Sequence, residues 1–147
     1  MTNSWQDFTE SEKQYPEEIA KAKIEGFSTA TKGLAELLIS ELSDQGRLRS
    51  SLNTDFSFRI TLVSPLLPQY RFKIMEFGYG VNMDPVKYIL EAGIDGELFG
   101  ADWSLDREKQ ISNSEFINTL SLVFASKTFI DLVSGLMKVA QKKTKEL

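Results

Sequence analysis

The sequence predicts an α+β fold with a long N-terminal helix, an antiparallel meander of three or four strands, and two C-terminal helices packed on one face of the sheet. Three observations lead to this prediction. Apolar residues recur every three or four positions near both ends of the chain, apolar and polar residues alternate in the middle, and the helical segments flank the strands instead of alternating with them. The 147 residues have the size of one domain. We therefore expect residues 1–147 to form a single α+β domain, with frayed ends at 1–15 and 141–147.

The first helix is predicted over residues 17–43. Its apolar residues follow the spacing of an amphipathic helix, and they are Ala20, Ile24, Phe27, Ala30, Leu34, Leu37, Leu38 and Leu42. Gly26 and Gly33 fall almost on one face of this helix, where each glycine costs about 1 kcal/mol relative to alanine. We expect these two glycines where another backbone packs closely, and we expect the helix to end near Gly46.

Two strands are predicted from the alternation that follows. Their apolar faces consist of Phe56, Phe58, Ile60 and Leu62 in the first strand and of Tyr70, Phe72 and Ile74 in the second. The two strands should pair as an antiparallel hairpin, and a bulge is expected at 75–77, where the alternation slips. We expect the inner face of the sheet to pack on the first helix, with Phe56, Phe58, Ile60, Phe72 and Ile74 contacting Phe27, Leu34 and Leu38.

The second half of the chain adds short strands and two helices. For residues 86–92 the alternation of Val86, Tyr88 and Leu90 favours a third strand over a short helix, and either 98–99 or 107–111 could add a fourth. The sequence 112–115 has the spacing of a capping box, so the Ser112 hydroxyl should cap the helix that follows. Ser126 is the expected N-cap of the final helix.

The composition excludes several classes of active site. The chain has no cysteine and no histidine, which removes disulfides, thiolate nucleophiles, Ser-His-Asp triads and the commonest transition-metal ligands. Only carboxylates, Lys, Arg, Tyr, Ser and Thr remain for catalysis, and no motif arranges them as an active site. We therefore predict no cofactor, no metal site and no catalytic residue, and the sequence disfavours an enzyme.

Negative charge is concentrated in one part of the chain. Residues 81–115 carry eight acidic and three basic side chains, whereas the whole chain has a net charge of −4. An EF-hand is disfavoured because its fifth position would be Phe99 and its twelfth Asp106. The acidic segment is either a solvated loop or a docking surface for a basic protein partner. The residues predicted to bind such a partner are Asp95, Glu97, Asp102, Trp103, Asp106 and Glu108.

The turn at 78–85 is a second candidate site. It combines flexible glycines with Tyr79, Asn82 and Asp84 between two strands, and such connections often carry binding residues. Ordinary turn chemistry explains the same residues, because Gly and Asn adopt positive φ and Asp precedes Pro. We retain Tyr79, Asn82 and Asp84 as possible ligand-binding residues.

These observations favour a non-catalytic protein-binding module, such as an inhibitor, an immunity-like protein or a regulatory accessory protein. The alternatives are a small-ligand-binding domain and a carboxylate-dependent hydrolase. The concentration of negative charge disfavours general binding of nucleic acid, which needs a basic face, and leaves room only for a local basic patch. No stretch approaches the ~18 apolar residues of a transmembrane helix, and no secretory signal is apparent, so we expect a cytoplasmic protein that does not enter a membrane. The sequence alone determines neither the partner nor the oligomeric state.

Overall fold

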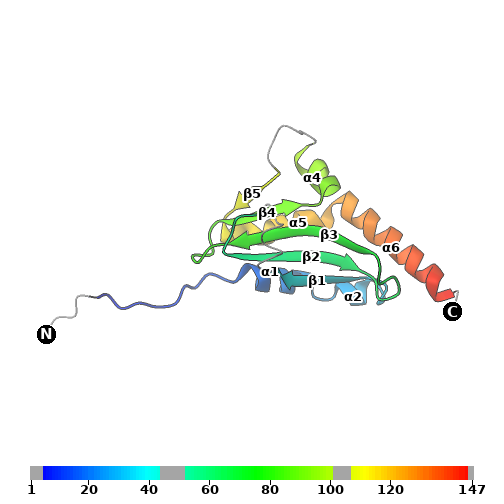
Figure 1. Ribbon diagram of the computed structural model, residues 1–147, viewed down its shortest axis with the longest axis horizontal. Coiled ribbons are helices and arrows are strands. Elements are labelled where there is room, and N and C mark those ends of the chain that lie inside the picture. The colour runs from blue at the N-terminus through cyan, green and yellow to red at the C-terminus, as the bar shows by residue number, and fades with distance from the viewer. Residues whose placement is uncertain (1–4, 44–51, 101–106, 146–147) are drawn as a thin grey trace.

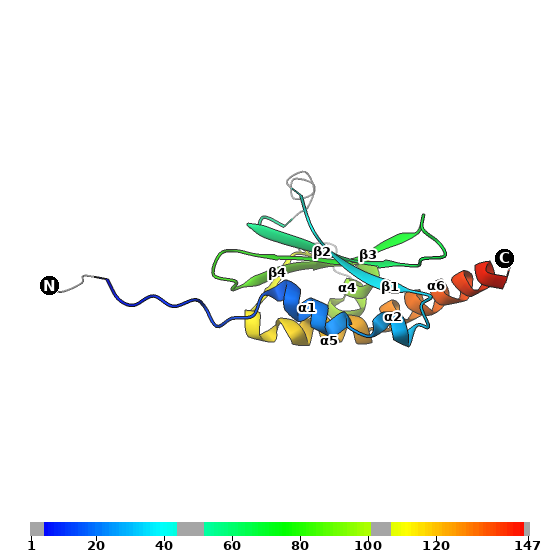
Figure 2. The same cartoon turned by 90° about the horizontal axis from the view of Figure 1, so that it is seen from below.

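The computed structural model describes residues 5–43, 52–100 and 107–145, and it shows an α+β fold. Helices cover one face of a five-stranded sheet, as Figures 1 and 2 show. In chain order the elements are α1 (Pro16–Ile24), α2 (Phe27–Ala30), β1 (Glu36–Glu41), β2 (Phe56–Val63), β3 (Arg71–Tyr79), β4 (Val86–Leu90), α4 (Ala92–Phe99), β5 (Lys109–Ile111), the 3-10 turn η1 (Asn113–Glu115), α5 (Phe116–Ala125) and α6 (Lys127–Lys145).

The sheet is a simple antiparallel meander. Its strand order is β1-β2-β3-β4-β5, so every strand pairs with its neighbour in the sequence. The predicted hairpin is confirmed, because β2 pairs with β3 over its full length, and residues 86–90 are confirmed as a strand. Of the two candidates for a further short strand, 109–111 forms β5, whereas Leu98 and Phe99 belong to α4.

The single long helix predicted over 17–43 is wrong, and this is why the sheet gains a strand. Helix α1 ends at Ile24, Gly26 adopts φ 87° and Gly33 adopts φ 75°. These left-handed conformations suit glycine and interrupt a helix, so the two glycines separate elements instead of packing inside one. Residues 36–41 then pair with β2, with Leu37 opposite Leu62 and Ile39 opposite Ile60.

The predicted core is largely confirmed, with two exceptions. Phe58, Ile60 and Ile74 are buried in it, and Phe27, Leu34 and Phe72 pack against it. Leu38 is exposed because side chains alternate along a strand, and Leu37 and Ile39 are the neighbours that pack against the core. Phe56 is also exposed, since it begins β2 and its ring packs only at the edge of the core, 5.5 Å from the ring of Tyr79.

The expected bulge lies in β3 at Ile74, one residue before the predicted position. Ile60 pairs with Met75, whereas the adjacent Thr61 pairs with Lys73, so Ile74 is the extra residue. Ile74 and Met75 are both fully buried. The bulge therefore lets two consecutive side chains enter the core, which a regular strand cannot do.

The face of the sheet opposite the helices carries a buried polar group. The Glu76 carboxylate is almost fully buried, and its Oε1 lies 2.9 Å from Nη2 of Arg59 and 3.3 Å from Nζ of Lys73. Leu42 and Leu52 are buried but lie outside the main core. The main core thus lies between the sheet and the helices. On the other face of the sheet, the buried carboxylate of Glu76 is paired with two basic side chains.

The two C-terminal helices begin differently. The Ser126 hydroxyl accepts a hydrogen bond from the Phe129 amide at 3.2 Å, which confirms Ser126 as the cap of α6. The capping role predicted for Ser112 is wrong, because its hydroxyl makes no hydrogen bond to the helix backbone. Asn113 is buried there instead, and its amide Nδ2 donates to the carbonyls of Gln14 at 2.9 Å and Met83 at 3.1 Å.

Candidate binding groove

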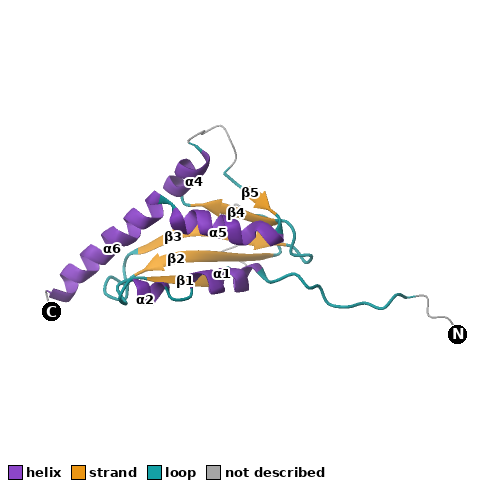
Figure 3. Ribbon diagram, turned by 180° about the vertical axis from the view of Figure 1, so that it is seen from behind, coloured by secondary structure: helices purple, strands orange, loops and turns teal. Residues whose placement is uncertain are grey.

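A groove of about 440 Å³ opens in the helical layer, between α1 and α2 on one side and the junction of α5 with α6 on the other. Figure 3 shows α5 running across the sheet and α6 diverging from it, and the two helices bend by 53° at their junction. Opposite this bend, the left-handed Gly26 separates α1 from the short α2. The groove therefore lies at the place where the helices diverge. At this place the helices do not cover the sheet completely.

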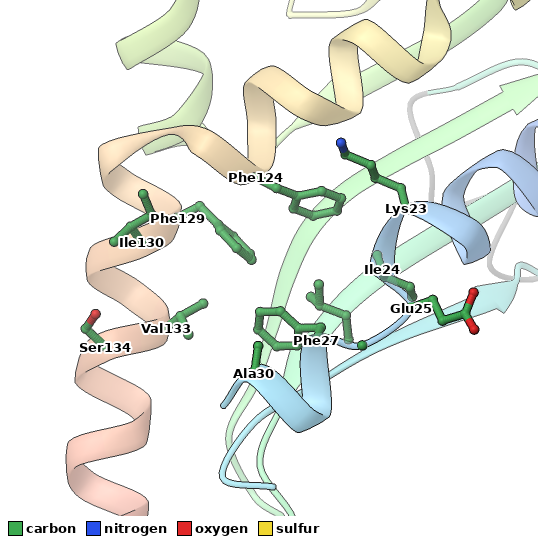
Figure 4. A pocket seen from close by; sticks show the side chains of 12 residues that line it. Lys23, Ile24, Glu25, Phe27, Ala30, Phe124, Phe129, Ile130, Val133 and Ser134 are labelled. Atoms are coloured by element: carbon green, nitrogen blue, oxygen red, sulfur yellow. The ribbon is translucent and has the colours of Figure 1, made fainter. Parts of the chain in front are cut away.

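Three aromatic rings form the apolar wall of this groove. The ring centroids of Phe124 and Phe129 are 5.2 Å apart, and those of Phe27 and Phe129 are 6.1 Å apart. Figure 4 shows these side chains facing one another from α2, α5 and α6. Phe129 and Val133 are buried, Phe27 and Phe124 are partly buried, and Ile130 on the rim is 50% exposed. The groove thus has an apolar wall that is packed against the core on one side and partly accessible to solvent on the other.

Basic side chains outnumber acidic ones when the groove is taken together with the hollow beside it. Lys23 and Glu25 line the groove, and Figure 4 shows the Glu25 carboxylate pointing away from the cavity. An adjoining hollow of about 260 Å³ shares Ser134 with the groove and adds Lys32 and Lys138. The groove and the hollow together are therefore lined by three lysines and one glutamate. This combination suits an apolar segment with acidic flanks.

A second apolar groove lies on the other flank of α6. It has a volume of about 390 Å³ and is formed by the connection between β2 and β3, by β3 and by α6. Tyr70 and Phe72 lie on the sheet side, and Leu132 and Val139 lie on α6. Helix α6 thus carries apolar side chains on both flanks as well as on its buried face.

The predicted acidic surface is partly engaged within the chain. Asp102, Trp103 and Asp106 lie outside the described residues. Asp95 is buried, and its carboxylate oxygens lie 2.6 Å from Nζ of Lys109 and 3.8 Å from Nε of Arg107. The side chain of Arg107 also donates to the carbonyl of Leu90. Asp95 therefore joins α4 to β5 and the segment before it.

Glu97 and Glu108 also contact groups of the same chain. The Glu97 carboxylate accepts hydrogen bonds from the backbone amides of Lys127 and Thr128, both at 2.7 Å, and from the Thr128 hydroxyl at 2.8 Å. These donors at the start of α6, the Thr128 amide first, lower the pKa of Glu97. Glu108 lies 3.7 Å from Nζ of Lys87. The structure does not gather these carboxylates with Asp95 into one unpaired acidic site.

Tyr79, Asn82 and Asp84 connect the turn to the N-terminal part of the chain. Tyr79 is buried, and its hydroxyl donates to both carboxylate oxygens of Glu17, at 2.6 and 2.9 Å. Burial, together with the neighbouring Glu17 carboxylate, raises the pKa of Tyr79. Lys13 donates to the Asn82 carbonyl at 3.2 Å and lies 3.9 Å from Asp84. The ligand-binding role of these residues stays a prediction. The contacts described here join the turn to α1 through Glu17 and to the segment before α1 through Lys13.

Sequence reasoning placed the site elsewhere and missed the groove. Phe27 belongs to the apolar stripe of the predicted first helix, and Phe124 and Phe129 fall at helical spacing with the apolar residues of the two C-terminal helices, so the sequence indicates core positions for all three. A signal was nevertheless present, because Ile130 lies outside the main apolar stripe of the last helix. A helix that carries apolar residues outside its main stripe has more apolar surface than one core can bury.

Comparisons of the whole chain with known protein families, with curated proteins and with solved structures find no match. Among the described helices, none has by itself the length and hydropathy needed to cross a bilayer, and only α5 and α6 taken together reach them. Within the same described residues, no cluster of three carboxylates could hold a metal ion.

Proposed function

We propose that the chain is a non-catalytic protein-binding module, of the inhibitor, immunity-like or regulatory accessory kind, and that the groove between α1–α2 and α5–α6 is its docking surface. Its partner would be a protein segment with apolar side chains and acidic neighbours. The observation that carries the proposal is the wall of three phenylalanine rings, two of them partly exposed, with Lys23 lining the same groove and Lys32 and Lys138 lining the adjoining hollow.

The apolar wall supplies the expected affinity. Burying one phenylalanine-sized side chain contributes about 1.5–3 kcal/mol, and aromatic residues dominate the energetic centre of most interfaces. Ile130 is half exposed and lies at the edge of the wall. A bound segment that filled the groove would contact Ile130, Phe27 and Phe124, which all line it.

The lysines would orient an acidic segment as it approaches and raise its association rate. Like charges around one apolar surface repel one another, and an acidic segment relieves this repulsion on binding. Such steering is screened by salt, since the Debye length falls from about 10 Å at 0.1 M to about 3 Å at 1 M ionic strength.

The other two functions receive less support. A small-ligand site usually encloses most of its ligand, whereas this groove has a half-exposed residue at its edge. A carboxylate-dependent hydrolase needs two carboxyl groups facing one another, and Glu25 is the one carboxylate among the lining residues of the groove.

Docking of a basic partner on the acidic segment stays a separate expectation. The described members of that surface, Asp95, Glu97 and Glu108, already contact Lys109, the start of α6 and Lys87. A basic partner would have to compete with these contacts. We therefore place the docking surface at the groove.

A display library of random peptides, selected on the folded chain, tests the proposal. Selected peptides should carry apolar residues next to acidic ones, and Ile130→Asp should weaken their binding about 10-fold or more, because it puts a charge at the apolar wall. Ile117→Asp is the matched control, since Ile117 is 47% exposed, lies in the first turn of α5, and does not line the groove. Peptides that bind both variants equally well would contradict the proposal.

A further inference from the structure

We propose that the groove is occupied by the N-terminal arm, residues 5–12, of a second copy of this chain. This inference rests on the proposed function, because it takes the same groove as the docking surface. Reciprocal exchange of the two arms would form a closed dimer in which each copy gives one arm and receives another.

The arm presents apolar side chains to solvent. Figures 1 and 2 show residues 5–15 as an extended segment that runs away from the sheet and the helices. Trp5 is 71% exposed and Phe8 is 79% exposed, and their ring centroids are 6.3 Å apart. Two large aromatic side chains close together and this exposed are typical of a segment that binds another surface.

The base of the arm is fixed to the body and sets its direction. Lys13 contacts Asn82 and Asp84, the Gln14 carbonyl accepts a hydrogen bond from buried Asn113, and Pro16 is fully buried. No glycine occurs between residues 5 and 15 to reverse the chain. The groove lies toward the other end of α1, beside Lys23–Phe27. An arm that continues in its observed direction therefore reaches a neighbouring molecule instead of its own groove, and residues 5–12 extend up to about 28 Å.

The arm and the groove are complementary in chemistry. The arm offers Trp5 and Phe8 to a wall formed by Phe27, Phe124 and Phe129. Residues 5–12 contain three acidic side chains and no basic one, whereas the groove and its adjoining hollow are lined by three lysines and one glutamate. The net charges are thus −3 for the arm and +2 for the groove and the adjoining hollow together.

The aromatic side chains of the arms would supply much of the area of a dimer interface. A buried aromatic side chain removes about 150–250 Å² from water, so four such side chains from two arms bury about 600–1,000 Å². The remaining side chains of the arms and the walls of the two grooves add to this area, and specific interfaces begin at about 1,200 Å².

Sedimentation equilibrium of the full chain over a range of concentrations tests the inference. The chain should form a dimer, and Phe8→Ser in the arm or Ile130→Asp in the groove should each raise its dissociation constant about 10-fold or more. Neither change disturbs the core, because both side chains are half exposed or more. The matched controls are Ile117→Asp and Val81→Ser, since Ile117 is 47% and Val81 83% exposed and neither belongs to the arm or the groove. Both controls should dimerise as the unchanged chain does.

A mixing experiment separates exchange between copies from folding back within one copy. A heterodimer of the Phe8→Ser and Ile130→Asp chains retains one intact arm facing one intact groove, whereas each homodimer has two altered sites. Because an arm whose docking is abolished by one change loses nothing more by a second, the mixture should associate more tightly than either variant alone when both substitutions abolish docking. A chain that stays monomeric at every concentration, or a dimer insensitive to both substitutions, would overturn the inference. If the chain is monomeric while selected peptides still bind and lose affinity with Ile130→Asp, the inference fails and the proposed function stands.

Discussion

Individual polar side chains in this protein act mainly as connections between elements. Glu97 of α4 accepts hydrogen bonds from the first two backbone amides of α6, Asp95 pairs with Lys109, and the Tyr79 hydroxyl binds Glu17. Each of these carboxylates pairs with a donor or a cation from another element of the chain. Residues that looked like free acids in the sequence therefore contribute to the fold.

Glu97 should make stability depend on pH. Its pKa is lowered in the folded protein, because the charged carboxylate accepts hydrogen bonds from the amides and hydroxyl at the start of α6. The stabilisation is present above the unfolded pKa, about 4.3, and is lost as the pH falls through the lower folded value. Urea unfolding should show Glu97→Gln less stable than the unchanged chain near neutral pH. The free energies of unfolding of the two chains should converge below about pH 4.

The control is Glu10→Gln in the exposed arm. A difference between Glu97→Gln and the unchanged chain that persisted to low pH would contradict the role of Glu97.

At the scale of elements, β1 shows how one segment can satisfy two patterns. Residues 34–42 are apolar often enough to continue the helical stripe, yet they also alternate sufficiently to form a strand. The glycines before them stop the helix, and the edge of β2 offers a full set of backbone hydrogen-bonding groups. Pairing with β2 therefore decides the structure of this segment.

Two adjacent leucines distinguish the strand from the predicted helix. Leu37 packs against the core, whereas Leu38 on the opposite face is exposed. Leu37→Ser should lower the free energy of unfolding by about 1–3 kcal/mol, and Leu38→Ser should change it by no more than about 0.5 kcal/mol. Denaturant unfolding of the two variants measures this difference. Equal losses would indicate that both leucines face one core, as in a helix.

At the scale of the whole molecule, the helices leave part of their own layer open. They cover one face of the sheet, but the bend between α5 and α6 and the short α2 leave the groove between them. The arm leaves the body from the opposite end of α1, and Asn113 joins its base to the turn before β4 and to the start of α5. One buried amide thus holds three segments that are distant in sequence.

Asn113 should therefore support both stability and the position of the arm. Asn113→Ala leaves the carbonyls of Gln14 and Met83 without this donor, so it should cost about 1–3 kcal/mol of unfolding free energy. Hydrogen exchange should also become faster at the base of the arm. Asn118→Ala, an exposed change on α5, the helix that follows η1, is the control and should be neutral or slightly stabilising. A neutral Asn113→Ala would show that other contacts hold the arm.

The sequence by itself determined the α+β class, the hairpin of β2 with β3, β4, the cap at Ser126 and the absence of cysteine and histidine chemistry. These features depend on local periodicity, local capping or composition, which are visible within a few residues. Phe58 and Ile60 were placed in the core for the same reason.

Only the tertiary structure decided the fate of residues 36–41, the partners of the acidic side chains and the existence of the groove. Strand pairing, the ion pair of Asp95 with Lys109 and the contact of Glu97 with α6 join residues distant in the sequence. The groove depends on the angle between two helices, and no periodicity within one helix encodes that angle. Phe124 and Phe129 therefore look like core residues in the sequence, and only the divergence of α5 and α6 leaves part of this apolar surface open to a partner.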